Sequence, residues 1–275
     1  MGDGSVGVGG IPADVVFLAL NPVAAGPEPP AETGAVRVIN SRYCLLMTSM
    51  PTVNFVERVW LAPGQVAAAV GEVRDLLRAR ERTQAAWTVD AASTELYDEL
   101  AGLAMTPYTD PPLEPRCTCL ALVQPPDWSA NPRVVVREAT DLQDFLAVAE
   151  LSASVFGISG ADRDGFVKSL RVRYELHRQG RSHMSTYLAF IDGELAGEAQ
   201  AMVTASGTNL SGSSVLRSAR GQGVYRALVA ARWNEAVERG RPALTVQAGA
   251  MSRPILERLG FQTVGTQLLL RDRFQ

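Results

Sequence analysis

Apolar and polar positions in the second half of the chain repeat at the periods of short strands and helices. Residues 134–139 (VVVREA) are typical of a strand, and the segment after them begins with Thr140 and Gln143 at the spacing of a helix capping box. Apolar positions at helical period follow, and a second helix is predicted over residues 162–178. This half therefore begins with one strand and two helices.

The same half continues with a hairpin. Residues 185–193 and 194–206 alternate apolar and polar side chains, and the Asp192-Gly193 pair between them is typical of a tight turn. The pattern then predicts a strand at about 209–216, a helix at about 223–239 ended by Gly240, a strand at 243–248, a short helix at 252–259 ended by Gly260, and final strands. The predicted order is β-α-α-β-β-β-α-β-α-β.

Part of this pattern occurs twice in the chain. Residues 63–89 align without a gap to residues 220–246, at a constant offset of 157. Each copy has a Gly-Gln turn, an amphipathic helix rich in Arg and Ala, and a strand with Thr-Val. A short helix with a glycine near its end follows in both copies, as TELYDELAGL and SRPILERLGF. The chain is therefore predicted to be an internal duplication with two similar lobes.

Breaks in the pattern indicate where the lobes end. Residues 1–12 carry five glycines and no periodicity, which predicts a flexible leader. Residues 124–133 (QPPDWSANPR) contain three prolines and interrupt the strand and helix signals. We place the first lobe at residues 13–124, a linker at 125–132 and the second lobe at 133–275.

Composition excludes several classes of protein. Hydrophobic residues make up 47% of the 275 residues and charged residues 20%, as in ordinary globular proteins. The net charge of −3 argues against a nucleic-acid partner, and no apolar run or basic leader indicates a membrane span or a signal peptide. We expect a soluble, cytoplasmic protein that binds neither nucleic acid nor membrane.

The cysteines and histidines support no disulfide framework and no metal site. Three cysteines and two histidines are present. Cys117 and Cys119 form a C-x-C pair on one face of a strand, where buried small apolar side chains are expected rather than metal ligands.

Residues 215–229 (VLRSARGQGVYRALV) carry the main candidate chemistry. A predicted strand runs into Arg220-Gly221-Gln222-Gly223 and then directly into a helix. Glycines let the backbone approach a pyrophosphate, the N–H groups of the turn point at it, and the helix dipole adds favourable charge. Arg220, with Arg217 or Arg226, supplies cationic donors. A bare R-G-x-G also occurs in ordinary turns, so its context matters.

That context resembles the GNAT family of acyltransferases. The family's coenzyme-binding signature maps onto Arg220, Gly223 and Tyr225, and Tyr225 departs from the usual Gly or Ala. Residues 252–261 (SRPILERLGF) resemble a second signature, which flanks the pantetheine arm. The resemblance covers residues 133–275. It implies an α/β fold of tandem GNAT-like lobes, each a central mixed β-sheet (α+β) flanked by helices.

The resemblance also implies an activity. Enzymes of this family transfer an acyl group from acetyl-CoA or another acyl-CoA to a primary amine, which attacks the thioester directly. We expect the acceptor to be a small molecule or a peptide, while an acyl-carrier protein remains a possible donor. A non-catalytic acyl-CoA-binding module and a decarboxylase of malonyl thioesters are the alternatives, and the oligomeric state is open.

The resemblance assigns two sets of residues. The predicted coenzyme-binding residues are Ser214, Val215, Leu216, Arg217, Arg220, Gly221, Gln222, Gly223, Val224, Tyr225, Arg226 and Ser252. The strand at 214–216 is expected to separate from its neighbour and to offer backbone hydrogen bonds to the pantetheine. Leu256 occupies the position of the family's usual tyrosine acid, so Ser252 or Tyr225 is the candidate acid, or the thiolate leaves unassisted. Ser252 is equally well explained as a helix N-cap.

Glu198 is the candidate general base, and a solvated glutamate on an outer sheet face is the alternative. Asp162, Asp164 and His183 are weaker candidates for this role.

In the first lobe Pro63 and Val66 replace Arg220 and Gly223, which places a side chain where the phosphate would approach. We therefore expect a degenerate first lobe that binds no coenzyme and shapes the acceptor site. Asn54 or Glu57 is expected to face the cleft between the lobes.

Overall fold

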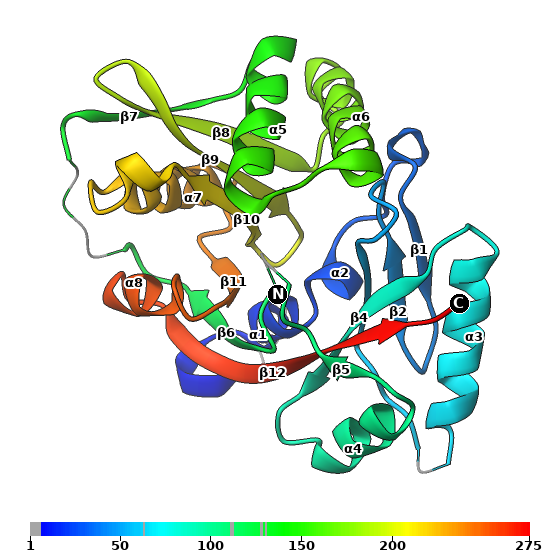
Figure 1. Ribbon diagram of the computed structural model, residues 1–275. Coiled ribbons are helices and arrows are strands. Elements are labelled where there is room, and N and C mark those ends of the chain that lie inside the picture. The colour runs from blue at the N-terminus through cyan, green and yellow to red at the C-terminus, as the bar shows by residue number, and fades with distance from the viewer. Residues whose placement is uncertain (1–6, 63, 111–112, 127–128, 130) are drawn as a thin grey trace.

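The computed structural model describes residues 7–62, 64–110, 113–126, 129 and 131–275 (Figure 1). Its helices are α1 (Ala13–Leu20), α2 (Pro22–Ala25), α3 (Val66–Arg78), α4 (Thr94–Gly102), α5 (Leu142–Phe156), α6 (Gly160–Arg178), α7 (Val224–Glu238) and α8 (Arg253–Arg258). Its strands are β1 (Val36–Ile39), β2 (Cys44–Met47), β3 (Asn54–Glu57), β4 (Gln84–Asp90), β5 (Thr106–Pro107), β6 (Arg116–Leu122), β7 (Val134–Glu138), β8 (Met184–Ile191), β9 (Glu194–Val203), β10 (Thr208–Val215), β11 (Leu244–Ala248) and β12 (Gln262–Arg273).

The strands form a single mixed sheet. Their order is β1-β2-β3-β4-β12-β6-β11-β10-β9-β8-β7, and β5 pairs with β12 off this path. Helices α5 and α6 lie together on one face of β8, β9 and β10, and α7 covers the opposite face (Figure 1). None of the helices in the described part of the chain is apolar over a length that would cross a membrane. The predicted α/β fold with helices around a mixed sheet is confirmed.

The predicted elements of the second half are present within a few residues of their expected bounds, and the hairpin turn lies at Asp192 (φ 51°) and Gly193 (φ 89°). The capping prediction was wrong by one residue. Asp141 is the N-cap of α5, and its carboxylate accepts a hydrogen bond from the Asp144 N–H at 2.9 Å. Asp144 in turn accepts from the Thr140 N–H at 3.0 Å. Aspartate caps a helix as well as threonine does, so spacing alone chose the wrong residue.

The duplication is visible in the fold. In the first half, β3 pairs in parallel with β4, and α3 connects them. In the second half, β10 pairs in parallel with β11, and α7 connects them. The short helices α4 and α8 follow at matching positions. The tandem arrangement that the repeat predicted is therefore confirmed.

The two halves exchange strands. Strand β4 pairs along its length with β12, from Gln84 opposite Arg273 to Asp90 opposite Gln267. Strand β11 pairs along its length with β6. Strand β12, drawn red in Figure 1, crosses from α8 to the side of α3. Each half thus supplies a strand that continues the sheet of the other, so the lobes predicted at 13–124 and 133–275 share one backbone ladder.

An N-terminal strap, residues 13–33, spans the junction of the halves. Helix α1 packs on β6, β11 and β12, α2 packs on β2, and residues 31–33 contact α6. In Figure 1 both helices lie between the strands of the two halves. Of the predicted leader, residues 1–6 lie outside the described residues. From Gly7 the chain is folded, and Ile11, 1% exposed, packs with Ala121 and Ala243, which contradicts a flexible segment there.

Side chains from both halves hold the strap. Gln267 Nε2 donates to the Leu20 carbonyl at 2.7 Å, and Arg37 donates to the Val23 carbonyl at 2.9 Å. The buried carboxylate of Glu57 accepts from the Ala24 N–H at 2.5 Å. Burial raises the pKa of Glu57 to about 8, against which the backbone N–H groups of Ala24 and Val23 lower it. This carboxyl group is therefore neutral over much of the physiological range.

Helix α6 also contacts the first half directly. Its residue Gly165 lies against the Ser49 carbonyl, so closely that an added Cβ would fall well inside van der Waals distance of that oxygen. Nearby, the Asp162 carboxylate accepts hydrogen bonds from the Thr52 N–H at 3.0 Å and from the Thr52 hydroxyl. The turn between β2 and β3 is thereby docked against the start of α6.

The burial of Glu57 predicts a pH-dependent stability. The unfolded chain ionises this group above its ordinary pKa of 4.5, whereas the folded chain keeps it neutral up to about 8. Folding stability should therefore fall as pH rises from about 5 to 8. At about 1.4 kcal/mol per pKa unit, the loss is on the order of 3–5 kcal/mol. Chemical denaturation across this range should show that Glu57→Gln flattens the decline. The exposed Glu95→Gln should leave it unchanged, and an equal decline in both variants would contradict this origin.

The α6 contact predicts opposite effects for two helical glycines. Gly165→Ala should destabilise the protein by about 1–3 kcal/mol, because the new methyl group meets the Ser49 carbonyl. Gly71 lies inside α3 with open space around it, so Gly71→Ala should stabilise by up to about 1 kcal/mol. Thermal or urea unfolding compares the two. Stabilisation by both substitutions would show that the contact yields easily.

Candidate functional site: the separated strand and the turn before α7

Strands β10 and β11 separate after a short stretch of pairing. Among the described residues, their parallel pairing is limited to Thr208 with Leu244 and Asn209 with Thr245. The register of β10 against β9 shifts between Asn209 and Gly212, and residues 212–215 then pair with β9 alone. Their other backbone edge is left without a strand partner. The strand separation that the resemblance implied is therefore present at the expected place.

The turn after β10 leads straight into α7. Residues 217–219 form a short 3-10 turn, Gly221 has φ 76°, and Gly223, the N-cap of α7, has φ 87°. Only glycine adopts such positive φ values without strain. The first intrahelical hydrogen bond at this end runs from the Ala227 N–H to the Gly223 carbonyl. The N–H groups of residues 224–226 therefore emerge at the helix start, where an anion binds favourably.

Three arginines surround this turn. Arg217 and Arg220 are exposed, and Arg226 is partly buried. None of the three forms an ion pair with the described part of the chain, although many other arginines are paired. Their guanidinium groups remain available to a ligand.

The remaining predicted residues of this segment have structural surroundings. Val224 is buried and Val215 and Leu216 are partly buried in the cluster beneath α7, so only their backbone groups can face a ligand. The Gln222 side chain donates to the Ser218 carbonyl at 3.1 Å, within the turn. A residue that sequence reasoning missed is Asn131, whose Nδ2 donates to the Gln222 carbonyl at 2.8 Å. Asn131 therefore ties the interlobe connection to the turn.

The residues considered as the general acid lack the surroundings of a good proton donor. Leu256 is fully buried in the core, as expected for an apolar residue in the family's tyrosine position. Tyr225 packs against the same cluster, and burial raises the pKa of its hydroxyl. Ser252 stands at the N-cap position of α8, yet its hydroxyl makes no capping bond and reaches only the Gly249 carbonyl at 3.4 Å. Ser252 therefore occupies the N-cap position, as the alternative predicted, but its side chain does not make the capping hydrogen bond.

Glu198 is buried, at 1% exposure, and the alternative of a solvated glutamate was wrong. Strand alternation correctly gives it a different face from Gly197, but α5 covers that face. The Ser152 hydroxyl of α5 donates to Glu198 Oε1 at 2.8 Å, and Ser214 Oγ lies 3.3 Å from Ser152 Oγ. Burial raises the pKa of Glu198, and hydrogen bonds from Ser214 and Ser152 oppose this effect. Ser214, itself opposite Glu198 in the sheet, links the carboxyl group to the separated strand.

The other base candidates lie elsewhere. The Asp162 carboxylate is engaged by Thr52 at the contact between the halves. Asp164 and His183 are exposed. The structure therefore brings Glu198, and none of these three, to the separated strand.

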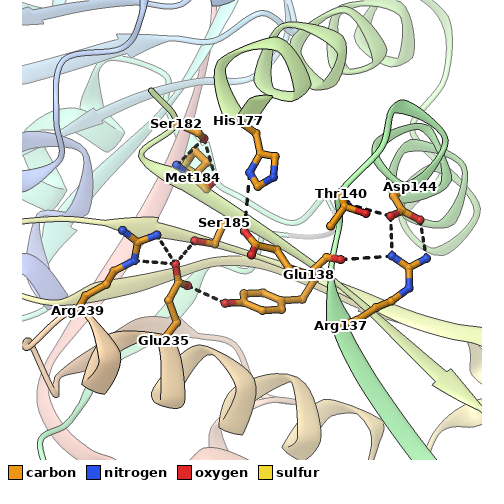
Figure 2. Close-up of polar contacts among 11 residues, drawn as sticks. Arg137, Glu138, Thr140, Asp144, His177, Ser182, Met184, Ser185, Glu235 and Arg239 are labelled. Atoms are coloured by element: carbon orange, nitrogen blue, oxygen red, sulfur yellow. Dashed lines mark hydrogen bonds and ion pairs between the residues drawn. The ribbon is translucent and has the colours of Figure 1, made fainter. Parts of the chain in front are cut away.

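A second polar cluster lies on the α7 side of the sheet (Figure 2). Glu235 of α7 accepts hydrogen bonds from the Ser185 hydroxyl, from Tyr187 at 2.9 Å and from Arg239 Nε at 2.9 Å. Burial and the Glu235 carboxylate raise the pKa of Tyr187. These contacts join α7 to β8, and their filled hydrogen bonds indicate a structural role.

The first half lacks a comparable turn. Pro63 lies outside the described residues. Val66 is 3% exposed in the core of its own half, so its side chain points inward and not toward a phosphate, contrary to prediction. Helix α3 begins at Val66 and therefore turns this residue into the core. Asn54 is also buried, with Nδ2 donating to the Pro51 and Gln84 carbonyls at 2.9 Å, so the prediction that it faces a cleft was wrong. Glu57 is buried under α2, where a cleft had been expected.

No group of metal-binding side chains is found among the described residues. Cys117 and Cys119 are buried on one face of β6. Gln267 of the neighbouring strand β12 lies on the same face of the sheet. Gln267 Oε1 accepts from Gln247 Nε2 at 2.8 Å and lies 3.3 Å from Cys119 Sγ. The two thiols therefore belong to a buried interstrand contact.

Comparison with known protein families gives a match to part of the chain. Residues 159–270 match the profile described as the acetyltransferase (GNAT) domain. No curated protein matches the sequence.

Solved structures match nearly the whole chain. A GCN5-related N-acetyltransferase from Kribbella flavida is 16% identical with a TM-score of 0.65, and the match covers 98% of this chain and 96% of that one. One from Sphaerobacter thermophilus is 16% identical with a TM-score of 0.61, covering 96% and 94%. A tandem GNAT protein from the clavulanic acid biosynthesis pathway is 17% identical with a TM-score of 0.55, covering 94% of each chain. The chain thus has the fold of tandem GNAT proteins, and its residues 159–270 match the model of an acetyltransferase (GNAT) domain.

Proposed function

We propose that this protein is an acyl-CoA-dependent N-acyltransferase, with acetyl-CoA as the first donor to test and an amine of a small molecule or a peptide as acceptor. The observation that carries the proposal is the coincidence of two features. A positively charged turn with two glycines precedes α7. The backbone edge of β10 that pairs with no strand lies directly before this turn in the chain. The turn suits the anionic phosphate groups of an acyl-CoA, and the strand edge suits the amides of its pantetheine arm.

In this proposal the turn binds the pyrophosphate. The N–H groups of residues 221–226 donate to its oxygens, and Arg217, Arg220 and Arg226 neutralise its charge. The backbone of residues 214–216 donates to and accepts from the amides of the pantetheine arm. An acyl-carrier protein presenting the same arm would use the strand edge without the nucleotide contacts.

The amine attacks the thioester carbonyl beside β10. Glu198 receives the ammonium proton through the Ser214 hydroxyl, because Ser214 separates this carboxylate from the strand edge. A base with a raised pKa accepts a proton from an ammonium group more readily than an ordinary glutamate does. Collapse of the tetrahedral intermediate breaks the carbon–sulfur bond and releases the thiolate.

We propose that the thiolate leaves unassisted. An ordinary thiol has a pKa of about 8.5, which makes the thiolate a fair leaving group. The raised pKa of Tyr225 makes it a weak proton donor, and Ser252 is a weaker one still. Neither residue compensates for Leu256 in the family's tyrosine position.

A non-catalytic acyl-CoA-binding module is the second candidate. The observations that favour it are the buried Leu256 and the sealed carboxylate of Glu198. Such a protein would bind acetyl-CoA at the same turn and would release no thiol with any amine.

The coenzyme site predicts a contrast between two glycines. Gly221 and Gly64 hold matching positions of the duplication, with φ 76° and 81°, so a valine should strain both turns similarly. Gly221→Val should abolish acetyl-CoA binding in calorimetry, whereas Gly64→Val should keep it. Arg220→Ala should weaken binding about tenfold or more. Absence of acetyl-CoA binding by the wild-type protein, or its equal loss in both glycine variants, would contradict the assignment.

The proton route predicts a specific kinetic defect. Glu198→Gln should lower kcat for thiol release on the order of 100-fold, with acetyl-CoA affinity unchanged. In the wild type, kcat should rise with pH as Glu198 loses its proton, with a midpoint above the ordinary pKa of 4.5. The variant should lack this limb, and Ser214→Ala should lower kcat less.

Glu194→Gln, on the same strand but exposed, is the control and should behave as wild type. Full activity of Glu198→Gln with an unaltered pH profile would remove Glu198 from the mechanism.

A further inference from the structure

One face of β9 carries a row of side chains that runs from the proposed reaction site toward the strap. Glu198, Gln200 and Met202 alternate along the strand onto this face. Ser152 of α5 covers Glu198, and Gly26 at the end of α2 lies against the Met202 side chain. The middle position, Gln200, is covered by Arg173 of α6.

Arg173 of α6 occupies this middle position. Its guanidinium donates to Gln200 Oε1, and Gln200 lies opposite Gly212 on the separated part of β10. The Gln200 Nε2 atom faces Gly212, where a Cβ would stand 3.8 Å away. The Arg173 side chain is partly exposed to solvent. Burial lowers the pKa of Arg173 to about 10, so the group is still cationic at neutral pH.

Positive charge exceeds negative charge around this row. Arg173 has no carboxylate partner among the ion pairs of the described residues, and neither has Arg232, which is fully buried under β9. Nη2 of Arg232 has no hydrogen-bond partner among the residues that the structure describes. Glu198 is the one buried carboxyl group among the described residues that acts on both arginines. The nearby Glu235 is already paired with Arg239.

A buried arginine without a counterion is costly unless a ligand supplies one. We propose that Arg173, with Gln200, binds a carboxylate carried by the acyl acceptor, so that the acceptor is an amino acid. This inference rests on the proposed function and names its substrate class. A planar guanidinium binds a carboxylate through two parallel hydrogen bonds, which a lysine cannot reproduce.

The spacing along β9 fits such an acceptor. Gln200 and Glu198 are two residues apart, which is about 6.6 Å along a strand. A carboxylate bound at Arg173 and Gln200 leaves the amine of the same amino acid within hydrogen-bond reach of Ser214. The row therefore holds both ends of the acceptor, with the amine at the strand edge where the thioester lies.

The test compares matched ligands by direct binding. Glycine, L-leucine, L-phenylalanine and L-lysine, each beside its carboxamide, are titrated by calorimetry into the full chain, with and without CoA. At least one free amino acid should bind about tenfold or more tightly than its carboxamide. Arg173→Gln should remove that preference without changing acetyl-CoA affinity, and Arg173→Lys should restore only part of it. Arg171→Gln, on the exposed side of the same helix, is the control and should keep it.

Thiol release from acetyl-CoA supplies the second readout. Arg173→Gln should raise KM for the amino acid about tenfold or more and leave KM for acetyl-CoA unchanged. Equal use of acids and carboxamides by the wild type would overturn the inference, and this comparison needs no folded variant. Binding of an amino acid through Arg173 without any thiol release would instead contradict the proposed transferase and leave the carboxylate site standing. No binding of any free amino acid would overturn the site itself.

Discussion

The backbone hydrogen bonds between exchanged strands hold this protein together. Strand β12 lies between β4 and β6, and β6 lies between β12 and β11, so the centre of the sheet is built from alternating contributions of the two halves. Neither half can complete its own sheet, because the strand that would close each gap comes from the other half. The relative position of the halves is therefore set by hydrogen-bond register and not by an adjustable interface.

The candidate site depends on that rigidity. The β10 edge, the turn before α7 and the row on β9 all belong to the second half. From the first half, Gly26 at the end of α2 lies against Met202 of β9, and the turn after β2 contacts α6. A loosely attached first half would let these contacts shift. Because β12 and β6 hold the halves in one sheet, the contacts that the first half makes with α6 and β9 keep a fixed position.

Local patterns in the sequence predicted the elements because each has a local cause. The Asp192-Gly193 turn takes positive φ values that few other residue pairs allow, and Gly223 does the same at the start of α7. The duplication was readable because both copies keep the same order of turn, helix and strand. These features depend on residues that are close together in the chain, so the sequence alone is enough to predict them.

The misses come from contacts between distant segments. Alternation placed Glu198 on one sheet face correctly, but it cannot say that Ser152, 46 residues earlier, covers that face. Arg173 looks like any charge on an amphipathic helix until Gln200 and Gly212 are placed beneath it. The strand exchange could not be predicted either, because the apolar pattern of a strand such as β6 does not determine which strand it pairs with. Of the candidate site, the turn was predictable and the acceptor side was not.

The exchange of strands also constrains the order of events during synthesis. When β4 and β6 have left the ribosome, the strands that lie beside them, β11 and β12, are still more than a hundred residues away in the chain. The first half must wait with open sheet edges, which are exposed to pairing with other nascent chains. The first half therefore stays incomplete until the strands of the second half have been synthesised.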